Sequence, residues 1–302
     1  MESYKSLPFA TYDLAVYLPG GALLTLIGRY VLDEVFGFHV GGLDALVGDD
    51  AVGLAIKAIT WLSVSYLLGH LGAFISTYTV ERVVHRFLGY PSDNWLEREK
   101  LVNGGQANEK EIQKTLLSKT LSVGRKDFGI SASLSLIFLL PLPPFVVAFL
   151  IFKPVGFYSA KLPEAIYSDL RQRFKLLGVS VEVQRGTRWD KIVEHYVSNN
   201  CAGGYVRMYN YLVIYGALRL LAFVMTLLLW VIIISDFKQI FEIGYDFHLG
   251  KTIAFFGLSG ATFMSMMAFA KFNRRYFEES IMAFLLTPFV PIAPAAEPPR
   301  RR

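Results

Sequence analysis

Among the few charged side chains that interrupt the long apolar stretches of this sequence, Arg219 is the most costly to bury. It lies about ten residues inside the apolar stretch 209–234. A charge at membrane depth generally faces a helix bundle or a water-filled cavity, where it serves a function. Two other interpretations are open. The long side chain could reach the lipid headgroups, or it could form a structural pair with Asp13, which is predicted near the same membrane face.

His70 is a second polar residue at depth, in the inner half of the stretch 51–77. A proton relay needs further ionisable groups at a similar level, and only Arg219 offers itself. We prefer the interpretation in which His70 shares a hydrogen bond with a serine or tyrosine of a neighbouring helix. Arg219, His70 and Asp13 are therefore the polar candidates inside the membrane.

Residue types suited to catalysis occur elsewhere, but without the pattern that catalysis needs. Cys201 has His195 and Asp190 nearby in the sequence, the types that a thiol hydrolase uses. No family signature surrounds them, and a free cysteine is more often a small buried apolar residue. The five histidines lack the paired spacing of a zinc site, and there is no Walker-type phosphate-binding loop. The sequence predicts no enzyme, no metal and no cofactor.

Two apolar stretches carry small residues at every fourth position. They are Ser65, Gly69, Ala73 and Thr77 in the one, and Gly257, Ala261 and Ser265 in the other. Such a stripe lets two backbones approach closely and marks a helix–helix contact. We favour packing within one chain, and a contact between copies in a homo-oligomer stays open.

The composition indicates a membrane protein. Hydrophobic residues make up 53% of the chain and charged residues 18%, against roughly 45–50% and 25% in an ordinary soluble domain. The surplus lies in long apolar runs. Lysines and arginines in cytoplasmic loops explain the net charge of +5 better than nucleic-acid binding does, so no nucleic-acid partner is predicted.

Five stretches are long enough to cross a bilayer, which takes about 17–25 apolar residues. They are 14–32, 51–77, 133–152, 209–234 and 252–270. The second is predicted to continue as a helix through "VERVVHRFLGYP" and to stop there, because proline rarely continues a helix. Four of the five are uninterrupted and are predicted to be full transmembrane helices.

The stretch 133–152 is different because it has prolines at its middle, Pro141, Pro143 and Pro144. Proline removes a backbone donor and clashes with the preceding turn, so a continuous helix is not expected here. The halves on either side are each too short to span alone. The segment is therefore either a kinked span or a hairpin that turns back within the membrane.

The distribution of lysine and arginine favours the hairpin. If the segment turns back, 25 of the 30 basic residues fall on one side and four on the other, with Arg219 within the membrane. If it crosses, the split is 12 against 17. Cytoplasmic loops are enriched in lysine and arginine, so we predict a plasma (inner) membrane protein with both termini cytoplasmic.

The predicted fold class is an all-α polytopic membrane protein with four full transmembrane helices, a proline-broken membrane hairpin and helical cytoplasmic loops. In the second loop, "LPEAIYSDLRQRFKLLG" and "RWDKIVEHYV" are predicted helices, the former with Gly178 just past its end. The segments in order are a first transmembrane hairpin (1–78), a cytoplasmic helical loop (79–128), the broken membrane segment (129–152), a second cytoplasmic segment (153–208), a second transmembrane hairpin (209–271) and a partly disordered tail (272–302).

Three classes of function are compatible with this pattern. We favour a membrane-anchored interaction or effector protein, whose partners are the lipid bilayer and a protein on the cytoplasmic face, because its loops are substantial, charged and helical. The alternative is a channel or transporter, with Arg219 and the break at 141–144 near the permeation path. A membrane-embedded enzyme is the third class, and it lacks a convincing catalytic set.

Overall fold

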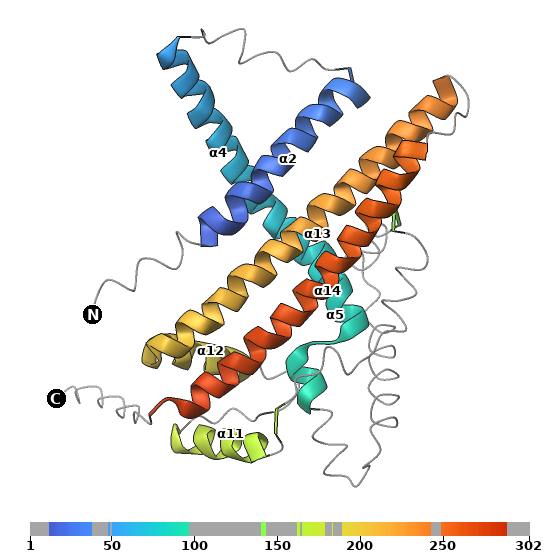
Figure 1. The fold of residues 1–302 in the computed structure, drawn as a ribbon. Helices are drawn as coiled ribbons and strands as arrows, with labels where there is room; N and C mark the ends of the chain where they lie inside the picture. The colour runs from blue at the N-terminus through green and yellow to red at the C-terminus, as the bar shows by residue number, and fades with distance from the viewer. Residues whose placement is uncertain are drawn as a thin grey trace, which may run out of the picture. The chain divides into compact units, whose positions relative to one another are not determined.

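The computed structural model describes residues 12–37, 48, 50–96, 140–142, 162–163, 165–178, 183, 189–242 and 249–288. Within these residues every regular element is a helix (Figure 1). The elements are η1 (Asp13–Tyr17), α2 (Leu18–Tyr30), η2 (Val31–Val35), α4 (Ala51–Ser76), η3 (Thr77–Glu81), α5 (Arg82–Leu88), α11 (Ala165–Leu176), α12 (Trp189–Asn200), α13 (Ala202–Glu242) and α14 (Leu249–Leu286), where η denotes a π-helix.

Four helical stretches are long and apolar enough to cross a membrane: Asp13–Asp33, Ala51–His85, Ala202–Phe241 and Leu249–Leu286. They contain the four uninterrupted stretches of the sequence, so the prediction of an all-helical chain with four such helices is confirmed. Of the proline-broken segment the structure describes Leu140, Pro141 and Leu142, which lie in a turn. The rest of that segment lies outside the described residues, and the hairpin stays a prediction.

The chain divides into two compact units. Unit 1 comprises Met1–Gly89, Ser118–Pro154 and Leu212–Phe272, and unit 2 comprises Tyr90–Leu117, Val155–Tyr211 and Asn273–Arg302. Two helices run from one unit into the other. α13 begins in unit 2 and continues into unit 1, and α14 does the reverse.

In unit 1, a long helical stretch runs from α4 through η3 into α5. It begins at Asp50, whose side chain accepts a hydrogen bond from the Gly53 N–H at 2.9 Å and so caps the first turn. It ends after Leu88, where Gly89 takes a positive φ of 72° that few other residues tolerate. The predicted stop at this point is confirmed.

The helices α2 and α4 cross each other (Figure 1), with glycines at their closest contact. A Cβ atom at Gly21 would lie closer than 3.0 Å to the backbone of Ser65 and Gly69, and one at Gly69 would clash in the same way with the backbone of Tyr17. Thr25 adds a polar contact, with its Oγ1 3.3 Å from the Oγ of Ser65. The crossing therefore depends on the absence of side chains at Gly21 and Gly69.

We expect Gly21→Ala to destabilise unit 1 by about 1–3 kcal/mol, because the added methyl group forces two backbones apart. Gly28→Ala is the matched control, since a Cβ there meets nothing within 4 Å. Alanine has the higher helix propensity, so the control should be neutral or slightly stabilising. Thermal unfolding of both purified variants in the same detergent measures the difference, and equal melting temperatures would contradict the crossing.

Unit 2 has an interior of its own. α11 turns Ile166, Leu170 and Phe174 inward at four-residue spacing, and α12 contributes Val193 and Val197. The beginning of α13 and the end of α14 complete this core together with Trp95, which lies in a helical stretch at 91–96. α11 ends at Leu176, and Gly178 just past it has a positive φ of 67°, as its predicted position after the helix requires.

Arg173 links α11 to the end of α14 through hydrogen bonds. Its guanidinium donates hydrogen bonds to the carbonyl oxygens of Leu285, at 3.0 Å, and Thr287. These carbonyls belong to the last turn of α14 and to the residue after it, where the negative end of the helix dipole attracts a cation. The same guanidinium lies over the Phe284 ring, 5.1 Å from its centre. One side chain thus joins two segments far apart in the sequence.

Candidate functional site

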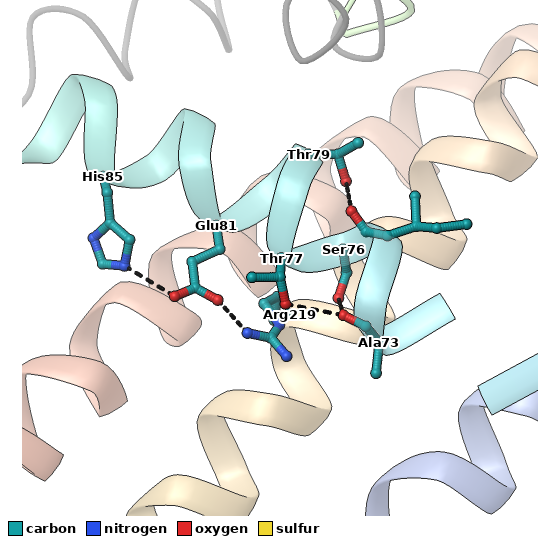
Figure 2. Close-up of polar contacts among 8 residues, drawn as sticks. Ala73, Ser76, Thr77, Thr79, Glu81, His85 and Arg219 are labelled. Atoms are coloured by element: carbon teal, nitrogen blue, oxygen red, sulfur yellow. Dashed lines mark hydrogen bonds and ion pairs between the residues drawn. The ribbon is translucent and has the colours of Figure 1, made fainter. Parts of the chain in front are cut away.

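Arg219 is part of a cluster of three ionisable side chains in unit 1 (Figure 2). It donates a hydrogen bond from Nη1 to Oε2 of Glu81. The other carboxylate oxygen of Glu81 lies 3.6 Å from Nε2 of His85, one helical turn further along the chain. The exposed fractions of the three side chains are 12% for Arg219, 23% for Glu81 and 4% for His85. Glu81 therefore bridges two basic groups in a largely buried position.

The π-helix η3 carries Glu81 into this position. α4 gives way to η3 after Ser76, and Glu81 is the last residue of the π segment. Side-chain hydroxyls bond to carbonyl oxygens around the transition: Ser76 Oγ and Thr77 Oγ1 donate to Ala73, at 2.7 and 3.1 Å, and Thr79 Oγ1 donates to Ile75 at 2.9 Å (Figure 2). A π segment inside an α-helix often marks a functional site, because it turns the following side chains to a new direction.

The cluster lies near one end of the apolar part of unit 1. Along α14, Lys251 and Lys271 are about 30 Å apart at 1.5 Å per residue, which matches the thickness of the hydrocarbon layer. The ring of His85 lies 6.0 Å from that of Phe269, half a turn before Lys271. Arg219 is therefore close to one end of the apolar part of unit 1 rather than at its middle, and Glu81 compensates its charge.

Asp13 and His70 are placed elsewhere in unit 1. Asp13 accepts a hydrogen bond from the Tyr66 hydroxyl at 3.2 Å, so the suggested pairing of Arg219 with Asp13 gives way to the pairing with Glu81. The His70 ring packs against the rings of Tyr17 and Tyr66, with centroids 3.9 and 4.5 Å away. Tyr17 belongs to η1 and Tyr66 to the same helix as His70, and the contacts that the structure records are between rings. The hydrogen bond to a serine or tyrosine of a neighbouring helix stays a prediction.

The two stripes of small residues have different surroundings. In α4, Ser65 and Gly69 meet α2, and Ala73 is buried on the same side. In α14, Ser265 contacts α13, with its Oγ 3.9 Å from Sδ of Met225. Gly257 faces open space, and Ala261 is only partly buried. The α4 stripe packs within the chain, whereas the α14 stripe is open at Gly257 and in contact with α13 at Ser265.

The three residue types of a thiol hydrolase are not brought together. Cys201 packs against the core of unit 2, next to Gly204. His195 is exposed, and its Nε2 lies 3.1 Å from Nδ2 of Asn199. In the part of the chain that the structure describes, no group of three or more His, Cys, Asp or Glu side chains is placed to hold a metal ion.

The partners of Arg219 were not predicted from the sequence. Glu81 and His85 lie in "VERVVHRF", directly after the stretch 51–77. The partner proposed for Arg219 from the sequence was Asp13, whereas Glu81 and His85 lie just beyond the stretch 51–77. The available signal was their spacing of four residues, which places a carboxylate and an imidazole on one face of a helix.

No protein-family model, no curated protein sequence and no solved structure matches this chain. The function must therefore be argued from the geometry of the two units and of the Arg219–Glu81–His85 cluster.

Proposed function

We propose that this protein is a membrane-anchored interaction component, in which unit 1 spans the bilayer and unit 2 binds a partner protein on the cytoplasmic face. In this proposal both termini are cytoplasmic, the membrane is a plasma (inner) membrane, and the proline-broken segment turns back within it. The concentration of lysine and arginine in the polar segments supports this orientation.

The observation that carries the proposal is the closed interior of unit 2. Leu170, Val193, Ile281 and Phe284 are fully buried there, and they come from three different helices, α11, α12 and α14. Loops that merely connect membrane helices have no need of a shared core. A core holds helix surfaces in fixed positions, which a binding surface requires because ordering a flexible surface on binding costs affinity.

The outward face of α11 is the part of unit 2 best suited to bind a partner. Arg171, Lys175 and Leu176 are exposed along it. Among the described residues no carboxylate pairs with Arg171 or Lys175. The guanidinium of Arg171 lies over the Tyr167 ring, 5.7 Å from its centre, which limits its motion. An apolar side chain flanked by cations that have no carboxylate partner in the described part of the chain fits a partner surface with acidic residues around an apolar centre.

The position of Arg219 supports an interaction protein over a channel. A permeation path needs polar groups that continue across the membrane. In unit 1 the ion pairs described in α13 and α14 lie toward the two ends of the apolar part, with Arg219–Glu81 at one and Lys251–Asp236 at the other. The charge that had suggested a path is thus neutralised near the boundary of the membrane.

The test is charge reversal on α11. The full-length protein carrying Arg171→Glu and Lys175→Glu should lose at least about tenfold in recovery of its partner, because like charges placed across an interface cost several kcal/mol. Chemical cross-linking in native membranes, followed by purification and quantitative mass spectrometry, measures the recovery. Arg171→Lys with Lys175→Arg preserves the charge and should retain the partner.

Lys191→Glu on α12 is a second control, because Lys191 is exposed in the same unit but already pairs with Glu194 at 2.6 Å. If the reversed α11 face and this control recover the same proteins in the same amounts, the proposal fails. If proteoliposomes that contain the protein show an ion flux, and Arg219→Leu alters that flux, the channel or transporter is favoured instead.

A further inference from the structure

We propose that Arg82 and Lys271 bind the headgroups of anionic phospholipids at one end of unit 1. Both side chains are exposed, on two different helices, near the boundary of the apolar part. The proposal assigns a lipid-binding role to unit 1 and is independent of the partner of unit 2.

Each of the two cations lies over an aromatic ring of its own helix. The guanidinium carbon of Arg82 is 4.5 Å from the centre of the Tyr78 ring, one turn earlier. The ammonium nitrogen of Lys271 is 5.8 Å from the centre of the Phe272 ring. A ring beneath a cation holds it without neutralising it. The N–H groups that face away from the ring stay free to bind a phosphate, which a guanidinium can do through two parallel hydrogen bonds.

The cations at the two ends of unit 1 differ in their partners. At the far end Arg29 lies 3.7 Å from Asp33, and Lys251 lies 2.9 Å from Asp236. Within the described ranges, no carboxylate pairs with Arg82 or Lys271. The end that holds the Arg219–Glu81 pair therefore carries, in addition, two cations without a carboxylate partner among the described residues. A leaflet rich in anionic lipid complements such a surface.

The order of side chains along the helices matches the layers of a bilayer. On α4, η3 and α5 an exposed face presents Phe74, then Tyr78, then Arg82, with the rings of Phe74 and Tyr78 4.9 Å apart. The side chains change in this order from apolar through amphipathic to cationic. The layers of a bilayer change in the same order, from acyl chains through the interface to the phosphate groups. On α14, exposed Met264 precedes Lys271 by two turns on the same face. A lipid fits this gradient better than a protein does, because the faces also expose apolar side chains.

The experiment measures phosphatidylglycerol binding to the purified full-length protein. Native mass spectrometry of the protein in detergent, titrated with phosphatidylglycerol or with phosphatidylcholine, gives the affinity for each lipid. Arg82→Gln with Lys271→Gln should weaken phosphatidylglycerol binding by at least about fivefold, the effect of about 1 kcal/mol for one basic residue near the membrane surface. Binding of phosphatidylcholine should not change.

Three further variants make the result specific. Arg29→Gln with Lys251→Gln removes the same charge from the far end and should leave phosphatidylglycerol affinity unchanged. Arg82→Lys with Lys271→Arg keeps the charge and should retain most of it. Tyr78→Leu keeps the apolar surface but removes the ring beneath Arg82, and should weaken binding about twofold. The proposal is overturned if the glutamine variant binds phosphatidylglycerol as the wild type does, or if the far-end control loses as much affinity.

Discussion

Replacing Glu81 with leucine is expected to destabilise unit 1 by about 3–5 kcal/mol, the effect of removing one partner of a buried ion pair. Arg219 would keep its charge in a position where its side chain is only 12% exposed. Its Nε already lacks a hydrogen-bond partner among the described residues, so Glu81 supplies the main compensation that the structure records. Water near the membrane boundary lowers the cost toward the smaller figure.

The double variant Glu81→Leu with Arg219→Leu separates the pair from the packing around it. Removing both charges leaves no uncompensated ion, so the double variant should recover most of the stability lost in Glu81→Leu. Unfolding in mixed micelles with increasing dodecyl sulfate measures the three free energies. A double variant as unstable as the sum of the two single variants would show that Arg219 and Glu81 act independently.

Asp236→Asn is the matched control for this experiment. Asp236 pairs with Lys251 at 2.9 Å, but both side chains are more than 40% exposed. Exposed ion pairs contribute about 0–1 kcal/mol, so this variant should unfold almost as the wild type does. If Glu81→Leu costs no more than Asp236→Asn, the Arg219–Glu81 pair is not a buried one in the membrane-embedded protein.

The long helices could be predicted from the sequence because hydropathy is a local property. Each uninterrupted apolar stretch became a helix, and the end at Gly89 followed from the glycine–tyrosine–proline run. The lengths were underestimated, since α13 and α14 continue past their apolar parts into polar residues that no hydropathy window includes. The beginning of α13, up to Tyr211, and the end of α14, from Asn273, belong to unit 2.

The partner of Arg219 could not be predicted because it depends on how helices rotate about their axes. The π-helix η3 inserts an extra residue per turn before Glu81, which changes the direction of every later side chain in that stretch. A regular α-helix over the same residues would place Glu81 on another face of the stretch. The stripe at Gly257 and Ala261 stays a prediction for a related reason: spacing identifies a face of a helix but not what covers it, and Gly257 faces open space within the single chain.

The core of unit 2 could not be predicted from local sequence patterns. The helices α11 and α12 were predicted one by one from their patterns, and both are found. Nothing in either pattern shows that their apolar faces meet Trp95 or the last turns of α14. Contacts between residues so far apart in the sequence depend on the course of the whole chain: the beginning of α13 and the end of α14 both belong to unit 2 together with α11 and α12.

Trp95→Ala is expected to cost unit 2 about 3–5 kcal/mol, because it removes the largest fully buried side chain of its core. The Trp95 ring lies 5.9 to 6.0 Å from the rings of Tyr167, Trp189 and Phe277, which come from three different helices. Hydrogen exchange followed by mass spectrometry should show α11 and α12 losing protection together. The apolar part of α13 at 220–234 should keep its protection.

Two further variants identify the cause of this loss. Trp95→Phe should be much milder, because it keeps an aromatic ring and removes an indole N–H that has no hydrogen-bond partner among the described residues. Leu176→Ala removes an exposed side chain of α11 and should leave exchange unchanged. Amides of α11 and α12 that exchange in Trp95→Ala as in the wild type would contradict a shared core.

Trp95→Ala also separates the proposed roles of the two units. A binding face on α11 is held in place only while the core of unit 2 is formed, so this variant should lose partner recovery in cross-linked membranes. Its affinity for phosphatidylglycerol should persist, because Arg82 and Lys271 belong to unit 1. Glu81→Leu, in contrast, acts within unit 1 and should lower the stability of the spanning helices first. If Trp95→Ala retained its partner with α11 unprotected, the partner would have to bind elsewhere than on α11.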